Sequence, residues 1–338
     1  MKNTVLVDIL LPTYNGEKYL GEQIESIISQ TYSNWRLVIR DDGSWDSTIS
    51  MIESYQQKLK EKLIVVKDQK HNLGVCNNVF ELLKYASAPY VMLADQDDVW
   101  FPNKVEFLLK KIYKAERQYQ NTPILVHAEG ITTNEDMVPL TGKKITPLQG
   151  SKLSRREIIP YRKSLIGYAS GYKKERNEYN RLLFQNVIQG ASMIINRALI
   201  GKLEVLFPKK LPKKQYHDSI IASIASIEGK IIFCARPLMF YRQHTKNLVG
   251  TKRVTLWKWN KLNESEREQW KSTHFIKVNS VKCELLLKYY REDMDARKKR
   301  CTEYFLKNKV GLCGIIRNQL WEDFTKEEIG LLLLCKYI

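Results

Sequence analysis

The sequence contains no apolar run that approaches the roughly 20 residues needed to cross a bilayer. Its first segment, Met1 to Asp8, also lacks the layout of a secretory signal peptide, so we expect a chain that stays in the cytoplasm. Composition argues against a disordered chain, because 43% of the 338 residues are hydrophobic. A chain of this length can bury a substantial core.

Cysteine is scarce, and no two cysteines form a Cys-x-x-Cys pair. The six are Cys76, Cys234, Cys283, Cys301, Cys313 and Cys335. Without an export signal we expect them to be reduced thiols. No two Cys or His residues have the spacing of zinc-finger ligands, which argues against a zinc site.

Acidic residues are in the minority, with 37 Asp and Glu against 55 Lys and Arg. Residues 1–150 hold 17 basic and 19 acidic side chains, a net charge of −2, whereas residues 151–338 hold 38 and 18, a net charge of +20. Such a basic half can bind nucleic acid through phosphate contacts, but the sequence contains no RNA- or DNA-binding motif. We therefore expect no nucleic-acid partner, and a non-enzymatic nucleic-acid binder remains a distant alternative.

The first half alternates apolar strands with amphipathic helices. The predicted strands are residues 5–11, which Pro12 ends, 35–40, 63–67 and 90–94. The predicted helices are residues 17–30, a segment from Asp46 or Ser47 to about 61, and about 74–86. This alternation predicts an α/β fold, with a mostly parallel, Rossmann-like sheet flanked by helices. Ligands bind beyond the carboxyl ends of the strands in such sheets.

The segment Ala94-Asp95-Gln96-Asp97-Asp98-Val99-Trp100 is the sharpest signal at those strand ends. Its three carboxylates repel one another unless a cation lies between them. Mg²⁺ and Mn²⁺ prefer oxygen ligands and commonly bridge carboxylates to substrate phosphates. A solvated acidic turn is the alternative. The sequence has neither a Walker-type Gly-Lys-Ser/Thr loop nor a G-x-G-x-x-G motif, so phosphates would be held mainly through the metal.

Two further strand ends carry candidate binding residues. Tyr14 follows the first strand, where its ring can stack on a base or simply pack. Asp42 follows the second strand, where it can accept a hydrogen bond from a base N–H or form the turn before Gly43.

The second half begins with a weaker pattern. Residues 139–163 are rich in Lys, Pro and Gly and predict a mobile, basic loop region, whereas 189–196 predict a short strand. Asp218 opens the apolar stretch 219–227, which predicts a helix. An isolated Asp at a helix start is more often a cap than a catalyst, because it also gains from the helix dipole.

Taken together, these motifs resemble family 2 glycosyltransferases with the GT-A fold, over roughly residues 3–245. The matching segments are LPTYNGEKYL (11–20), QTYSNWRLVIRDDGSWDST (30–48), HNLGVCNN (71–78) and ADQDDVWFPNKV (94–105). The resemblance implies a catalytic domain at 1–250, with a nucleotide-sugar-binding half at 1–130 and an acceptor half at 131–250. The remaining residues, 251–338, form a helical, basic C-terminal region.

The resemblance also implies a role for individual residues. The nucleotide-sugar site comprises Tyr14 and Asp42 at the base, Asp95 near the ribose, and Thr13, Glu17 and Asn72. Helix capping explains Glu17 equally well. Asp97, the second Asp of a D-x-D motif, binds the divalent metal, Mn²⁺ or Mg²⁺. His244 coordinates the metal or a phosphate oxygen, and a surface histidine is the alternative.

The His-Asp pair at 217–218 resembles the family motif whose Asp is the general base of an inverting transferase. Ser219 departs from many relatives, which carry an aromatic there, so acceptor packing can differ. The segment from Tyr241 to Gly250 reads Y-R-Q-H-x-x-N-x-x-G, similar to relatives described as rhamnosyltransferases. This similarity favours L-rhamnose from dTDP-rhamnose as the sugar transferred, with a UDP-hexose as the alternative donor. The acceptor expected is a lipid-linked cell-wall or capsular polysaccharide.

Residues 251–338 combine tryptophan with basic residues and helical periodicity. Trp257, Trp259 and Trp270 lie among lysines, and 297–300 is a compact basic run. Amphipathic helices of this kind can lie on an anionic membrane surface. A helical bundle that packs on the catalytic domain, or a homodimer through these helices, is the alternative. We therefore expect a peripheral protein at the inner face of the plasma membrane.

Overall fold

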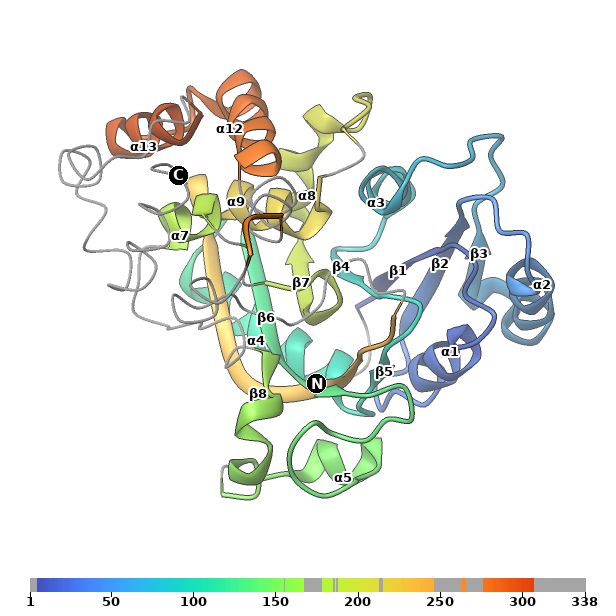
Figure 1. Cartoon of the computed structure of the whole chain (residues 1–338). Helices are drawn as coiled ribbons and strands as arrows, with labels where there is room; N and C mark the ends of the chain where they lie inside the picture. Colours follow the sequence, from blue (N-terminus) through green and yellow to red (C-terminus); the bar gives the residue numbers. More distant parts are fainter. Residues whose placement is uncertain are drawn as a thin grey trace.

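The computed structural model describes residues 5–154, 156–166, 178–184, 186, 188–212, 215–245, 263–265 and 276–306. Within these residues, one sheet contains eight strands in the order β3-β2-β1-β4-β7-β6-β8-β5. The strands are β1 (Val7–Thr13), β2 (Trp35–Asp41), β3 (Leu63–Val65), β4 (Tyr90–Leu93), β5 (Val99–Trp100), β6 (Ile124–Thr133), β7 (Met193–Asn196) and β8 (Lys230–Arg242). The main helices are α1 (Leu20–Ile28), α2 (Thr48–Leu59), α3 (Val75–Leu83), α4 (Lys104–Gln118), α5 (Pro147–Lys152), α7 (Glu178–Phe184), α8 (Arg197–Leu203), α9 (His217–Glu228), α12 (Ile276–Tyr290) and α13 (Ala296–Leu306). Figure 1 shows their arrangement.

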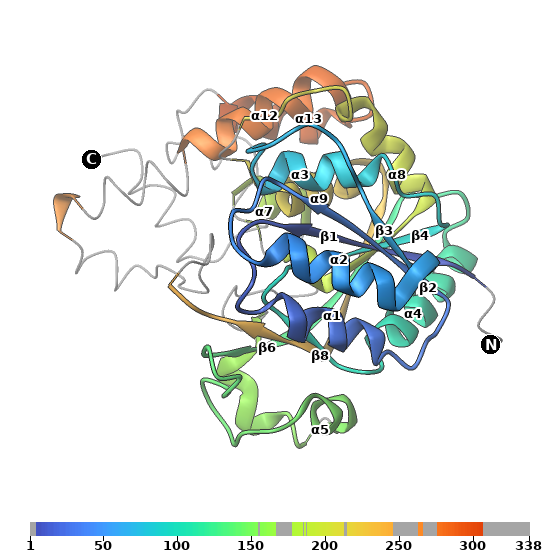
Figure 2. The ribbon, with the colours of Figure 1, turned by 90° about the vertical axis from the view of Figure 1, so that its right-hand side faces the viewer.

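Two layers of helices cover the two faces of the sheet, as Figure 2 shows. Alternate residues of β1 and β2 point to opposite faces, as the pleat requires. Leu10 and Val38 pack with α3, α8 and α9, whereas Ile9 and Leu37 pack with α1 and α4. Strands that are buried on both faces consist of continuous apolar runs. The sequence therefore predicts these strands well.

One half of the sheet is parallel and consists of the strands β3, β2, β1 and β4. These are the four strands that the sequence predicts in the first half of the chain. Beyond β4, the pairs β4–β7, β7–β6 and β8–β5 are antiparallel, whereas β6 and β8 are parallel. The mixed α/β architecture with flanking helices confirms the predicted fold class. Within the described part of the chain, no helix has the length and apolar character to cross a bilayer.

Pro12 lies inside β1, so the prediction that it ends the strand is wrong. The pairing of β1 with β4 runs from Val7 to Leu10 only. In a parallel strand, alternate residues bond to opposite neighbours, and the carbonyl of Thr13 already faces β2 by accepting from the Asp42 N–H at 2.9 Å. Pro12 therefore faces the side where pairing has ended, and its missing N–H costs no ladder hydrogen bond.

Two predictions about the second half also need correction. Residues 139–163 contain α5 and the 3₁₀ helix Ile159–Ser164, not only loop. Thr146 and Gln149 form a capping box that starts α5, a signal that a composition argument overlooks. The segment 189–196 begins with a 3₁₀ turn, Gly190–Ser192, and only its second half is strand β7.

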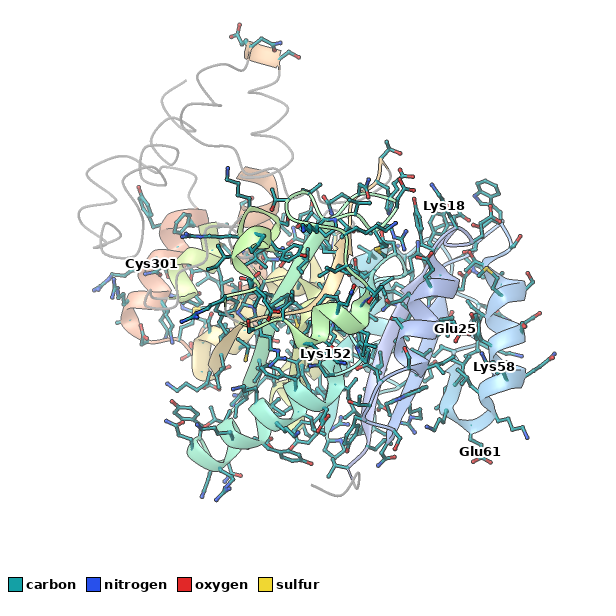
Figure 3. All side chains as sticks on the ribbon, turned by 90° about the horizontal axis from the view of Figure 1, so that it is seen from below. Lys18, Glu25, Lys58, Glu61, Lys152 and Cys301 are labelled. Atoms are coloured by element: carbon teal, nitrogen blue, oxygen red, sulfur yellow. The ribbon has the colours of Figure 1, made fainter. Side chains whose placement is uncertain are left out.

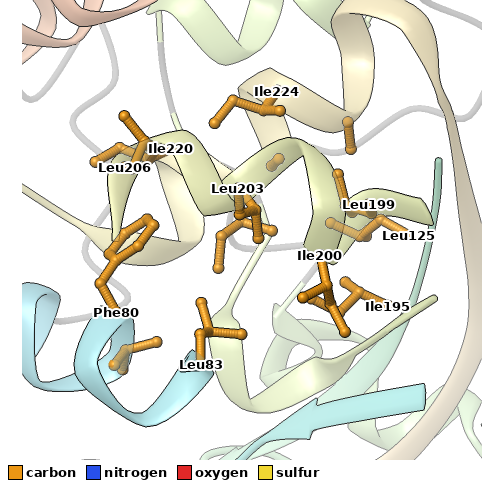
Figure 4. Packing of buried hydrophobic residues seen from close by; sticks show 14 of the residues in the cluster. Phe80, Leu83, Leu125, Ile195, Leu199, Ile200, Leu203, Leu206, Ile220 and Ile224 are labelled. Atoms are coloured by element: carbon orange, nitrogen blue, oxygen red, sulfur yellow. The ribbon is translucent and has the colours of Figure 1, made fainter. Parts of the chain in front are cut away.

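The two C-terminal helices pack onto the helix layer that contains α7 and α9. Figure 1 shows α12 and α13 beside α7 and α9, and the buried side chains of Leu286 and Phe305 belong to the same apolar cluster as those of α8 and α9. Figure 4 shows this cluster where α3, α8 and α9 meet. The predicted helices at 264–292 and 293–308 are thus confirmed in their described parts. The three tryptophans at 257, 259 and 270, Asn247, Gly250 and the tail from 307 lie outside the described residues.

The far edge of the molecule carries α1 and α2. In Figure 3, Glu25 of α1 and Lys58 of α2 lie on the opposite side of the molecule from Cys301 of α13. The two charged groups form an exposed ion pair at 2.8 Å, which contributes little to stability. The C-terminal helices therefore extend the side of the fold that contains α7 and α9, away from the edge that carries α1 and α2.

Candidate active site

The carboxyl ends of β1 and β2 are joined by side-chain hydrogen bonds. The Thr13 hydroxyl donates to Asp41 Oδ2 at 2.8 Å, and the Ser44 backbone N–H donates to Asp41 Oδ1 at 2.7 Å. The Ser44 hydroxyl accepts in turn from the backbone N–H of Asn15 at 2.8 Å. Thr13 therefore contributes to the shape of this edge through Asp41.

Asp42 is buried at the end of β2 and anchors the loop that precedes α3. Its two carboxylate oxygens accept from the backbone N–H groups of Leu73 at 2.9 Å and Gly74 at 2.8 Å. The buried guanidinium of Arg40 donates to the same carboxylate at 3.2 Å. Asn72, at a positive φ of 56°, donates its backbone N–H to the Asp42 carbonyl at 2.9 Å. The contact of Asp42 with a base stays a prediction, because three of about four acceptor positions on the carboxylate are already used.

Tyr14 presents an exposed ring beyond β1, with 46% of its surface accessible. Its backbone is fixed by Gln96, whose side-chain carbonyl accepts from the Tyr14 N–H at 2.9 Å and whose amide donates to the Tyr14 carbonyl at 3.0 Å. Gly16 permits this contact, since a Cβ there would lie 2.6 Å from Gln96 Oε1. The loop after β1 is thereby held against the acidic loop after β4.

Glu17 has a structural partner in the loop before α2. Its carboxylate accepts from the backbone N–H of Ser47 at 3.0 Å, while the Glu17 N–H donates to Asp46 at 3.2 Å. Asp46 also accepts from the Thr48 N–H at 3.0 Å, so it supplies the first-turn contact at α2. These contacts give Glu17 the capping role, and its place in nucleotide binding stays a prediction.

The carboxylates of the acidic loop after β4 interact with the buried amine of Lys104. Burial, and then the charge of Asp97, raises the pKa of Asp95 to about 6, and burial raises the pKa of Asp98 well above its usual range. Lys104 lies beneath them, where its Nζ donates to the Ala191 carbonyl at 2.6 Å and lies 3.8 Å from the centre of the Trp100 ring. Burial lowers the pKa of Lys104 to about 7, and the charges of Asp98 and Asp95 oppose this fall.

Arg242 and His244 bring the end of β8 to the same loop. The Arg242 backbone N–H donates to Asp98 Oδ1 at 3.2 Å, and its Nε donates to the Asp97 carbonyl at 2.9 Å. His244 Nε2 lies 2.8 Å from Asp97 Oδ2, and the His244 ring packs 4.9 Å from that of Tyr19. The two predicted metal ligands therefore meet in the structure, although they are 147 residues apart in the sequence.

The protein offers few candidate metal ligands in this region. Within the described residues, no group of three or more His, Cys, Asp or Glu side chains has the arrangement of a complete metal site. One carboxylate and one imidazole fit a Mg²⁺ or Mn²⁺ ion that takes its remaining ligands from substrate phosphates and water.

Asp218 lies in the first turn of α9. Its Oδ1 accepts from the Ser219 N–H at 2.7 Å, and burial raises its pKa to about 6, against hydrogen bonds that lower it. His217 is 7% exposed and packs against Gly190, where a Cβ would lie 2.4 Å from its Nε2. The charge of Asp218 raises the pKa of Asp95, and the charges of both carboxylates raise the pKa of Tyr241, which places the two carboxylates in one electrostatic environment.

Comparisons with known proteins identify the family of this chain. A model of glycosyl transferase family 2 matches residues 8–179, just over half of the chain. The chain belongs to glycosyl transferase family 2.

Individual relatives match different parts of this chain. UDP-Glc:alpha-D-GlcNAc-diphosphoundecaprenol beta-1,3-glucosyltransferase WfgD of Escherichia coli is 35% identical over 109 residues, which are 32% of this chain and 42% of that protein. An uncharacterized glycosyltransferase of Haemophilus influenzae is 26% identical over 244 residues, 72% of this chain and 67% of that protein. The chain thus spans about two fifths to two thirds of the length of these curated relatives.

A solved structure supports the fold. The crystal structure of S. aureus TarS 1-349 in complex with UDP-GlcNAc has a TM-score of 0.52 and 18% identity to this chain, and the match covers 89% of this chain and 71% of that chain. At this identity the likeness shows the fold alone, and it confirms the expected GT-A architecture.

Several residues that shape the site were not predicted from the sequence. Lys104, Arg40 and Gln96 lie inside the motif segments, yet only the structure shows that their side chains hold the three loops. One signal was available for Lys104. A lysine at the first position of a helix opposes the helix dipole, so its charge is expected to be satisfied elsewhere.

Proposed function

We propose that this glycosyltransferase moves a sugar from a nucleoside-diphosphate donor onto a hydroxyl of a lipid-linked glycan, with inversion at the anomeric carbon. The observation that carries the proposal is the position of Asp218. Its carboxylate lies at the start of α9 and shares an electrostatic environment with the acidic loop after β4. A base and a candidate donor site therefore lie within one region.

The chemistry follows from the protonation state of Asp218. A pKa of about 6 leaves the carboxylate ionised at neutral pH, yet basic enough to take a proton from an attacking hydroxyl. The hydroxyl oxygen then forms a bond to the anomeric carbon from the face opposite the diphosphate, and the bond to the diphosphate breaks. A single displacement of this kind inverts the anomeric centre.

A divalent cation fits the donor side of the proposal. Asp97 and His244 are the residues that would hold Mn²⁺ or Mg²⁺. Such an ion, when bound, neutralises the diphosphate and makes it a better leaving group. The base, ribose and remaining nucleotide contacts are proposed for Tyr14, Asp42, Asp95, Thr13, Glu17 and Asn72.

Two donors remain candidates, and each is supported by one observation. The motif from Tyr241 favours dTDP-rhamnose, but its residues 246–250 lie outside the described part of the chain. The name of WfgD specifies UDP-Glc, and its similarity to this chain supports a UDP-hexose. The same name includes a diphosphoundecaprenol-linked acceptor, which supports a lipid-linked polysaccharide acceptor and work at the inner face of the plasma membrane.

The decisive experiment incubates the protein with each nucleotide-sugar, Mn²⁺ and a diphosphoundecaprenol-linked acceptor, and detects products by mass spectrometry. We expect product from one donor only, with none after Asp218→Asn. Product from UDP-glucose and none from dTDP-rhamnose would reject the rhamnose assignment. Donor binding by Asp218→Asn, measured by thermal shift, should persist. Near-normal turnover in Asp218→Asn would remove Asp218 from the role of base.

The metal assignment has its own test. Asp97→Ala should lose the metal-dependent part of donor binding, measured by calorimetry with and without Mn²⁺. Glu135→Ala is a matched control, because Glu135 is a half-exposed carboxylate that pairs with Lys18 at 2.6 Å. Full transfer activity of the wild-type protein in excess chelator would refute a metal-dependent mechanism.

A further inference from the structure

The C-terminal helix α12 places a buried lysine directly behind the start of α9. Lys282 is 1% exposed, and its Nζ donates to the Ser219 hydroxyl at 3.0 Å and to the carbonyl of Leu182 in α7. Ser219 is the residue next to Asp218, and its backbone N–H donates to the Asp218 carboxylate. Lys282, from the C-terminal part of the chain, thus contacts Ser219, the residue next to the proposed base.

Packing alone does not explain a lysine at this position. Burial of an ammonium group is costly unless an opposite charge or several acceptors compensate for it. The flanking buried residues of α12, Cys283 and Leu286, are apolar and fully buried, so a methionine of similar length would suit the same surroundings. The negative charge that stabilises the ammonium group includes that of Asp218.

We propose that Lys282 is a positioning residue for the transfer reaction, which keeps the Asp218 carboxylate charged and oriented through the Ser219 bridge. The inference rests on the proposed function of Asp218 as base. It assigns the C-terminal helix a part in catalysis in addition to any contact with membrane. Ser219 supports this role, because its small hydroxyl leaves room for the lysine where an aromatic ring would not.

The groups that face Asp218 explain why one cation matters. The titratable ones are Lys282 from α12, Asp95 from the loop after β4, Tyr241 from β8, Cys76 from α3, and Tyr216 and His217 beside it in the chain. The Asn186 side chain and the Gly190 N–H also bond to the Asp218 carboxylate, but neither carries a charge. Among these described groups Lys282 is the one that carries a positive charge at pH 7. Burial lowers the pKa of Lys282 to about 8, so it is mostly protonated at pH 7. Its charge lowers the pKa of Asp218, against the larger effect of burial.

The direct test is the titration of Asp218 itself. The chain has 13 aspartates, and ¹³Cγ-aspartate labelling with Asp218→Asn as the reference identifies the signal of Asp218 by NMR. We expect Lys282→Gln to raise the titration midpoint by about one pH unit, because a neutral amide no longer favours the carboxylate. Lys282→Arg should restore the midpoint. Lys288→Gln, an exposed lysine six residues further on the same helix, should leave it unchanged.

A purely structural role predicts a different result. If Lys282 only ties α12 to α7, Lys282→Gln lowers the melting temperature but leaves the Asp218 midpoint where it is, and this outcome overturns the inference. Lys282→Met provides a second neutral variant if the amide prevents folding. For activity, the acid side of the kcat/KM profile should move to higher pH in Lys282→Gln and recover by about pH 8.

The inference and the proposed function can fail separately. An active Asp218→Asn protein removes the base role, whatever the titration shows. An inactive Asp218→Asn protein combined with an unchanged midpoint in Lys282→Gln removes only the role of Lys282.

Discussion

Asp218 is kept as a carboxylate in surroundings that favour its protonated form. Burial raises its pKa to about 6 from the usual value of 3.8, so the unfolded chain ionises first as the pH rises. The penalty on the folded state therefore grows between about pH 4 and pH 6 and stays constant above, at up to about 3 kcal/mol. Asp218→Asn removes this penalty while abolishing transfer. We expect urea unfolding to show a more stable variant at pH 7, by about 1–3 kcal/mol, and equal stabilities near pH 4. A variant that is less stable at pH 7 would contradict the burial argument.

Arg40 is the buried cation on which the loops after β2 depend. Its guanidinium pairs with Asp42 at 3.2 Å and with Asp68 at 2.9 Å, and its side chain is fully buried. Arg40→Met leaves two carboxylates without their partner, and the loss of one member of a buried pair typically costs about 3–5 kcal/mol. Arg117→Met, at an exposed position of α4, should change the unfolding free energy by less than about 0.5 kcal/mol. Equal urea midpoints for the two variants would contradict a structural role for Arg40.

The sequence predicts the titratable residues of the site better than the groups that hold them. Strand ends and the D-x-D spacing are local patterns, so Asp42, Asp95 and Asp97 can be found by reading along the chain. Their partners are not local, because Arg242, which donates to the Asp97 carbonyl, lies 145 residues further along the chain. Only the folded topology brings such residues together.

At the scale of elements, hydrophobic periodicity predicts the parallel half well because its strands are buried on both faces. It does not predict α5, a short helix that depends on its capping box. It also does not predict the end of β1, which depends on the neighbouring strand that Pro12 faces. The C-terminal helices were predicted as helices, but whether they form a separate region could not be read from their pattern. Their apolar residues join the cluster of α8 and α9, a relation between segments at least 48 residues apart in the sequence.

This shared core predicts cooperative unfolding. Leu286 of α12 is fully buried in the cluster, and Leu286→Ala should lower the unfolding free energy by about 2–5 kcal/mol. If α12 and the sheet unfold as one unit, tryptophan fluorescence and circular dichroism should keep coincident urea transitions. Leu148→Ala, at a residue that is 55% exposed on α5, is the control with little expected change. Two separate transitions in Leu286→Ala would show that residues 251–338 form an independent domain.

At the scale of the whole molecule, the two halves of the chain differ in net charge in a way that suits the proposed reaction. The first 150 residues have a net charge of −2 and hold the acidic loop, whereas the +20 half carries the proposed base and the C-terminal helices. Part of the basic run at 297–300 is used within the fold, because Lys298 donates to the Ile227 carbonyl and Lys299 pairs with Glu292 at 3.9 Å. Arg300 is exposed at the end of this run and remains available to a negatively charged surface.

The division of charge predicts binding to anionic lipid. Flotation with vesicles of phosphatidylcholine containing about 30% phosphatidylglycerol should carry the protein upward at low salt, and pure phosphatidylcholine should not, since each surface cation contributes about 1 kcal/mol. Binding should weaken as salt rises from 50 to 500 mM NaCl, because the Debye length falls from about 14 to about 4 Å. Arg300→Gln should weaken binding about fivefold, whereas Lys114→Gln, an exposed lysine of the acidic half, removes the same charge and should have a smaller effect. Equal losses in both variants would show that net charge alone attracts the lipid, and no flotation with either vesicle would reject the peripheral membrane location.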